Sequence, residues 1–159
     1  MVEGPWADRI EQLRASATTD FQRDVLADGV VTRAEYEEAV QRVVSCMADA
    51  GNQLDLHEQG GYYTFGVLAG PGVDEQFDRC MGETGGLVGL YVDMFTNPDN
   101  LEFQDILTQC LKREGLLPDS VTADEFWDTF LGDGPGDLPF DRENSAFTAC
   151  MANPALGAG

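Results

Sequence analysis

Lysine and histidine are almost missing from this chain of 159 residues, which has one of each, Lys112 and His57. Lysine and arginine together number nine against 29 aspartates and glutamates, for a formal net charge of −20. A field of that sign repels phosphate backbones and anionic lipid headgroups, so nucleic acid and bare membrane are not expected partners. It favours metal ions, cationic peptides or a basic protein face. The simpler alternative is that the acidity only keeps the protein in solution.

A long hydrophobic run is also missing. The most apolar stretch, 85–92, is far shorter than the roughly 20 residues that span a bilayer, so no transmembrane segment is expected. Residues 1–25 lack the basic start and apolar core of a secretory signal, so an exported form would have lost its signal. Apolar residues make up 43% of the chain, which predicts one globular domain over 1–159 with frayed ends at 1–4 and 155–159.

No two cysteines form a Cys-x-x-Cys pair, which argues against structural zinc. The four cysteines, Cys46, Cys80, Cys110 and Cys150, each sit in an apolar-x-x-Cys-apolar frame that places them beside a buried helical stripe. Two disulfides formed in an oxidising compartment fit this pattern. Three pairings are possible. The pairing that closes the shortest loops, Cys46 with Cys80 and Cys110 with Cys150, is the one we predict.

The apolar spacing predicts a mainly helical α+β fold, a bundle of about five to six helices with one hairpin. Helices are expected over 5–27, 32–50, 99–114, 122–131 and 142–152. Another begins near Asp74, and glycines 85 and 86 either break it or mark the close approach of another backbone.

Residues 53–68 change to a period of two around Gly60-Gly61, which predicts a β-hairpin with a two-residue turn. In that register Leu54 opposes Val67, and one face is apolar while the other is polar. Asp55, His57 and Tyr62 fall on the polar face, where aromatic and acidic groups together suit a cationic partner.

Catalytic motifs are scarce. None of the four serines lies in a Gly-x-Ser-x-Gly elbow, no glycine-rich phosphate loop follows a strand, and no carboxylate pair stands out. A non-enzymatic protein is therefore predicted. A hydrolase with an unrecognised carboxylate or His57 centre is the least favoured alternative.

Residues 24–35 resemble a calcium-binding EF-hand loop, with Asp24, Asp28 and Glu35 at ligand positions. Leu26 takes the place of one carboxylate, however, and a helix start explains every residue: Thr32 as N-cap and Glu35 completing a capping box. Thr122 and Glu125 repeat this pattern. We therefore prefer the helix start to a calcium site. A second acidic segment carries Asp133, Asp137 and Asp141 at every fourth residue, and a solvated loop is preferred there to a calcium site.

Several blocks of the sequence, "FQRDVLADGVVTRAEYEEAVQRVVSCMADAG", "GGYYTFGV", "LYVDMFTNPDN", "CLKREGL" and "FTACMANP", together with the four cysteines, resemble small uncharacterised exported proteins and putative lipoproteins of actinobacteria. The resemblance covers about residues 20–154. It implies a secreted or cell-envelope location, and a lipid anchor in the natural form would need a cysteine before Cys46. It carries no known activity. The sequence thus predicts an acidic, disulfide-bonded envelope protein that binds a protein or cationic peptide, with a calcium-binding extracellular module as the alternative.

Overall fold

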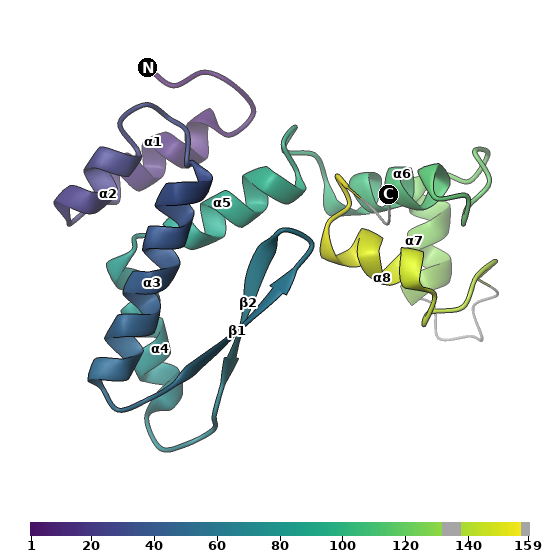
Figure 1. The fold of residues 1–159 in the computed structure, drawn as a ribbon. Coiled ribbons are helices and arrows are strands. Elements are labelled where there is room, and N and C mark those ends of the chain that lie inside the picture. Colours follow the sequence, from purple (N-terminus) through teal and green to yellow (C-terminus); the bar gives the residue numbers. More distant parts are fainter. Residues whose placement is uncertain (132–137, 157–159) are drawn as a thin grey trace. The chain divides into compact units, whose positions relative to one another are not determined.

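The computed structural model describes residues 1–131 and 138–156, which form eight helices and one two-stranded antiparallel sheet (Figure 1). The predicted mainly helical class with one hairpin and two disulfides is confirmed. The chain divides into two compact units, Met1–Met94 and Phe95–Gly159. The single domain over 1–159 stays a prediction. None of the helices among the described residues is long and apolar enough to cross a membrane.

The first unit begins with two helices, α1 (Ala7–Ser16) and α2 (Asp20–Val25). The prediction of one helix over 5–27 was wrong. Ala17 has extended backbone, and the Thr19 side chain caps a new helix by accepting from the Gln22 backbone N–H. The Gln22 side chain completes this capping box. The local Thr-x-x-Gln signature therefore starts a second helix although the apolar spacing continues across it.

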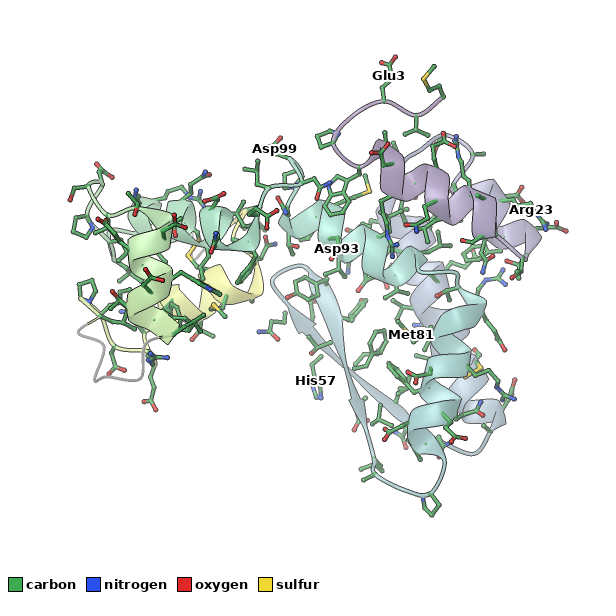
Figure 2. All side chains as sticks on the ribbon, turned by 180° about the vertical axis from the view of Figure 1, so that it is seen from behind. Glu3, Arg23, His57, Met81, Asp93 and Asp99 are labelled. Carbon is green, nitrogen blue, oxygen red and sulfur yellow. A yellow bond between two sulfur atoms is a disulfide. The ribbon has the colours of Figure 1, made fainter. Side chains whose placement is uncertain are left out.

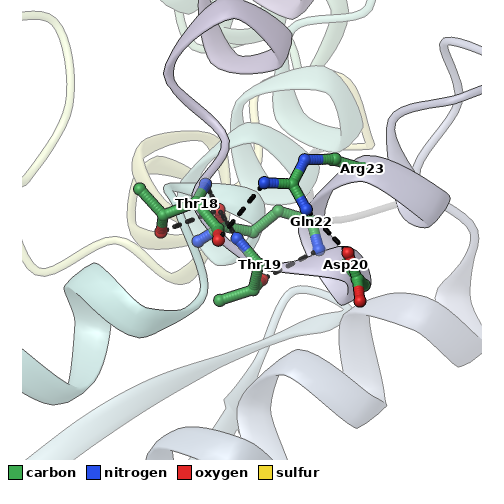
Figure 3. A network of polar contacts seen from close by, with 5 residues as sticks. All are labelled: Thr18, Thr19, Asp20, Gln22 and Arg23. Atoms are coloured by element: carbon green, nitrogen blue, oxygen red, sulfur yellow. Dashed lines mark hydrogen bonds and ion pairs between the residues drawn. The ribbon is translucent and has the colours of Figure 1, made fainter.

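Gln22 is the centre of a buried polar network (Figure 3). Its side chain is 2% exposed, and its Oε1 accepts from the backbone N–H groups of Thr18 at 2.6 Å and Thr19 at 3.2 Å. Its Nε2 donates to the carbonyl of Glu83 at 3.0 Å. One side chain therefore closes the α1–α2 connection and ties it to a segment 61 residues away in the chain.

The central helix of this unit is α3 (Arg33–Asp49), which packs along α4 (Val73–Glu83) (Figure 1). The stripe of α3 that faces inward is fully buried at Tyr36, Val40, Val43 and Met47. The Cys46–Cys80 disulfide joins the two helices, with the Cα atoms 5.6 Å apart, as predicted.

Thr84 and two glycines separate α4 from α5 (Leu87–Thr96). Gly85 and Gly86 have φ of +60° and +79°, a left-handed conformation that other residues rarely adopt. A Cβ on Gly85 would also lie 2.4 Å from Nε2 of Gln22. The predicted helix break occurs here, whereas the group that lies close to Gly85 is the Gln22 side chain and not another backbone.

The hairpin consists of β1 (Leu54–Gln59) and β2 (Tyr62–Val67). Its register pairs Leu54 with Val67 and His57 with Thr64, as predicted from the turn at Gly60-Gly61. Both turn glycines have positive φ, which a two-residue turn of type I′ requires.

The second unit contains α6 (Phe103–Arg113), α7 (Ala123–Leu131) and α8 (Ser145–Ala152). The Cys110–Cys150 disulfide joins α6 to α8 with the Cα atoms 5.8 Å apart, again as predicted. Around it lies a core of apolar side chains from all three helices and the α6–α7 connection: Leu107, Leu111, Leu117, Phe126 and Phe147.

Two helices of this unit start later than the sequence predicted. The helix expected from residue 99 begins at Phe103, because residues 97–101 form a turn in which Asn100 has a φ of 51°. The helix expected from residue 142 begins at Ser145, because the side chain of Asn144 caps it. Asp141 accepts from the backbone N–H of Glu143 within the preceding turn.

Candidate functional site

The hairpin of the first unit is held onto the helices by a stack of tyrosines. The rings of Tyr36 and Tyr91 are close to parallel with centroids 4.1 Å apart, and the ring of Tyr63 in β2 stacks on Tyr36 at 6.1 Å. Tyr36 is fully buried, and its hydroxyl accepts from the backbone N–H of Tyr63 at 2.9 Å. Further along, Phe65 meets Phe77 of α4 edge to face. The inner face of the hairpin is thus a packed surface.

Arg33, at the start of α3, connects this stack to the hairpin turn. Its guanidinium lies within 5.5 Å of the ring centroids of Tyr36 and Tyr63, pairs with Glu37 at 2.7 Å and donates to the carbonyl of Gly61. Partial burial alone lowers the pKa of Arg33. Hydrogen bonds to Tyr91 and Glu37 outweigh that effect and raise the pKa above its ordinary value. The turn is therefore anchored by a permanently charged group.

The three residues predicted to bind lie on the outer face of the hairpin, with Tyr62 next to the turn and Asp55 farthest from it. Asp55 and His57 are exposed, and Figure 2 shows His57 pointing away from α3 and α4. The Nε2 atom of His57 lies 3.5 Å from where a Cβ on Gly66 would be, so the imidazole covers this glycine. Tyr62 is half-buried, and the loss of water around its hydroxyl raises its pKa. A rigid sheet therefore presents one carboxylate, one imidazole and one partly exposed aromatic ring.

The EF-hand-like segment folds as the preferred helix start. Glu35 carboxylate oxygen accepts from the backbone N–H of Thr32 at 2.8 Å and from its hydroxyl at 2.7 Å, while the Thr32 hydroxyl accepts from the Glu35 backbone N–H. Asp28 accepts from the backbone N–H of Val30, closing the turn before the helix. The capping box at Thr122 and Glu125 is present as well.

Asp24 and Glu35 line one open cavity of about 410 Å³ together with Glu38. Within residues 1–131 and 138–156, however, no three His, Cys, Asp or Glu side chains are arranged to hold a metal ion. Asp133 and Asp137 lie outside the described residues, and Asp141 serves the turn before α8. The described residues thus bring none of the predicted calcium ligands together in a coordinating set.

Two further cavities are formed by residues that the sequence did not single out. One, of about 520 Å³, opens beside Cys46 between Glu38, Asp49 and Glu83; Arg42 on its wall pairs with Glu38 at 2.7 Å and covers the ring of Phe21. The other, of about 200 Å³, lies within the second unit between the 96–101 turn, α6 and residues 154–155.

Comparison with models of known protein families, with curated proteins and with solved structures gave no match. The resemblance to exported actinobacterial proteins therefore stays a prediction, and the function must be argued from the site.

The sequence did not predict the anchor formed by Arg33 and the tyrosines. A partial signal was present, since Tyr36 and Glu37 come three and four residues after Arg33. That spacing places their side chains on the same helical face as Arg33. The contact with Tyr63 and Tyr91 had no comparable signal, because it joins three separate elements.

Proposed function

We propose that this protein is a non-catalytic binding module of the cell envelope or the extracellular space, which contacts a cationic protein or peptide through the outer face of its hairpin. The observation that supports the proposal is the contrast between the two faces of one small sheet. The inner face is locked onto α3 by the tyrosine stack, whereas the outer face presents Asp55, His57 and the half-buried Tyr62.

The charge around this surface favours a positively charged partner. Residues 1–94 carry 17 aspartates and glutamates against six arginines, and four of those arginines already pair with an acidic neighbour on their own helix. Such a field accelerates encounter with a basic partner and repels acidic ones. The face of the Tyr62 ring can attract a cation, and the Asp55 carboxylate, farther from the turn on the same sheet face, offers a charged hydrogen-bond acceptor.

The rigidity of the hairpin also supports binding. Arg33 donates to a carbonyl of the turn, and two turn glycines fix the register. The Tyr36 hydroxyl accepts from the backbone N–H of Tyr63 in β2. A surface that is ordered before its partner arrives loses little conformational entropy on association.

Export is part of the same proposal, with the protein either released or lipid-anchored in an actinobacterial envelope. Two disulfides among the described residues fit an oxidising compartment. Fractionation of the source cells, followed by intact mass measurement with and without reductant, tests this. A reduced, cytoplasmic protein would contradict the proposal, and a mass increment on an N-terminal cysteine would identify the lipid-anchored form.

The binding test is a titration of the ¹⁵N-labelled protein with a short peptide of alternating lysine and leucine. We expect saturable shifts at the backbone amides of β1 and β2, with affinity falling about tenfold or more between 50 and 500 mM NaCl because surface charges are screened. Asp55→Asn and Tyr62→Ala should each weaken binding several-fold. The matched controls, Asp74→Asn and Phe103→Ala, lie on α4 and α6 and should leave it unchanged. Shifts spread evenly over all acidic surfaces would contradict a specific hairpin site.

A further inference from the structure

The cavity of about 200 Å³ in the second unit is bounded by three short segments: the turn at 96–101, the face of α6 that carries Ile106, Gln109 and Arg113, and residues 154–155. The α6 positions are spaced by three and four residues, so they form one continuous wall. All the lining residues belong to the second unit.

The walls of this cavity are held in place by hydrogen bonds. The side chain of Asn97 donates to the carbonyl of Leu101 at 2.7 Å and accepts from its backbone N–H at 2.9 Å, which closes the turn. The Arg113 guanidinium donates to the carbonyl of Pro154 at 2.8 Å and so ties the last wall to α6. A preformed concave site with a few polar groups is the usual form of a small-molecule site.

Two opposite charges line the cavity without neutralising each other. Arg113 at the end of α6 and Asp99 in the turn both contribute to the lining, and Arg113 forms no ion pair with any carboxylate of the described residues. Its hydrogen bond to the Pro154 carbonyl uses a single N–H of the five that a guanidinium offers. Both charged groups therefore keep capacity for a ligand.

The charge of the unit restricts what that ligand can be. Residues 95–159 carry 12 aspartates and glutamates against three basic residues, so a simple anion is repelled on approach. A simple cation is attracted by the unit, but it leaves the Arg113 guanidinium in the same cavity without a counter-charge. A molecule with one positive and one negative group avoids both penalties and can engage both charged side chains.

We propose that this cavity binds a small free α-amino acid with an aliphatic side chain. Its carboxylate would lie on Arg113, its ammonium on Asp99, and its side chain against Leu101, Ile106 and Pro154, which are among the apolar residues of the lining. The volume corresponds to about seven water-sized groups, which suits alanine, proline or valine. This site is independent of the proposed hairpin function, because it lies in the other unit.

The test compares valine with its two single-charge analogues, isovalerate and isobutylamine, each titrated into the full ¹⁵N-labelled chain at low salt. Valine should give saturable shifts at the amides of the 96–101 turn and α6. Each analogue should bind at least about tenfold more weakly, because it loses one charged hydrogen-bonded contact. Equal binding of isovalerate would overturn the zwitterion site in favour of an anion site, and no saturation by valine up to 50 mM would overturn the proposal altogether.

Variants assign the two charges. Arg113→Gln and Asp99→Asn should each weaken valine binding about tenfold or more. The matched controls are Lys112→Gln, the neighbouring cation outside the cavity, and Asp128→Asn, an exposed carboxylate on α7. Arg113→Gln also removes the hydrogen bond to Pro154, so the fold of this variant is checked by circular dichroism. If Arg113→Gln unfolds, Asp99→Asn decides the outcome, because the Asp99 side chain is exposed. Loss of binding in the control variants, or retention in Asp99→Asn, would overturn the assignment.

Discussion

Gln22 is a polar side chain that the protein cannot easily replace. Its amide satisfies two backbone N–H groups at the α1–α2 connection and one carbonyl at the end of α4. Leaving such buried groups without a partner costs about 1–3 kcal/mol each. The space for this amide exists only because residue 85 is a glycine.

Substitution of Gly85 tests that relation. Gly85→Ala should lower the free energy of unfolding by about 2 kcal/mol or more, because its φ is positive and the new Cβ would collide with the Gln22 amide. The matched control is Gly89→Ala in the exposed interior of α5, where a Cβ meets no other atom within 4 Å. That change should be neutral or stabilise by up to about 1 kcal/mol. Urea denaturation measures both, and equal effects would contradict the close packing at Gly85.

Glu35 is the residue at which a calcium ligand and a capping residue make opposite predictions. As a capping residue it stabilises α3 with or without calcium. Glu35→Gln keeps an oxygen that can accept these hydrogen bonds and loses only the charge, so it should lower the free energy of unfolding less than Glu35→Ala does. We expect Glu35→Ala to lose about 1 kcal/mol and millimolar calcium to leave the melting temperature of the parent protein unchanged. A calcium-dependent rise in melting temperature that disappears in Glu35→Gln would contradict the capping role.

Among the elements, the hairpin depends most on contacts made elsewhere in the chain. A two-stranded sheet is marginally stable in water by itself. Here the Tyr36 ring, its hydroxyl and Arg33 hold β2 from the side of α3, while Phe65 packs on α4. The hairpin and the two helices therefore form one packed arrangement, and the outer face inherits its order from the inner one.

The attachment of the hairpin should weaken in alkali. Burial raises the pKa of Tyr36 above its ordinary value of 10.0. Between that value and the raised one, the unfolded chain loses a proton that the folded chain retains, so the free energy of unfolding falls as the pH rises. The loss of water around Tyr62 acts in the same direction.

Tyr36→Phe separates the two roles of the hydroxyl. At neutral pH it should destabilise the protein by about 1–3 kcal/mol, because the backbone N–H of Tyr63 loses its acceptor. Above pH 10 the free energy of unfolding of this variant should fall less steeply than that of the parent protein. The reason is that the variant lacks the Tyr36 hydroxyl, which ionises more readily in the unfolded chain than in the folded one. Urea melts between pH 8 and 11 measure both effects, and an unchanged alkaline slope would contradict the buried, neutral hydroxyl.

For the molecule as a whole, the disulfides and the net charge act in opposite directions. A net charge of −20 repels itself in the compact state, whereas each disulfide restricts the unfolded chain. The bridges close loops with sequence separations of 34 and 40 residues, which corresponds to about 3–4 kcal/mol each. Each bridge lies within one unit, so each unit contains its own covalent restraint.

Removal of one bridge at a time tests the predicted single domain. Calorimetry of the parent protein should show one transition, and both Cys46→Ala/Cys80→Ala and Cys110→Ala/Cys150→Ala should shift that same transition downward. Separate transitions, each sensitive to one pair only, would show two independently folding units instead. Alkylation without reductant should label no cysteine of the parent chain, since all four are paired.

Much of this fold follows from short-range stereochemistry and could be predicted. The capping boxes at Thr32 and Thr122, the hairpin register around Gly60-Gly61 and the placement of cysteines beside apolar stripes each depend on residues within one or two turns of one another. The capping signature at Thr19 belongs to the same class and was overlooked, because the apolar spacing continued across it.

The candidate sites depend on contacts between distant residues, which no local pattern specifies. Gln22 meets Glu83, Arg33 meets Gly61, and Arg113 meets Pro154 across separations of 61, 28 and 41 residues. Local propensities select each helix and strand, but which side chains then share a cavity or a surface depends on how those elements pack. The sequence by itself therefore determined the mainly helical fold class, the helix starts at Thr32 and Thr122, the disulfide pairs and the acidic character of this protein. Only the packing of distant elements created the anchored hairpin face and the cavity lined by Asp99 and Arg113.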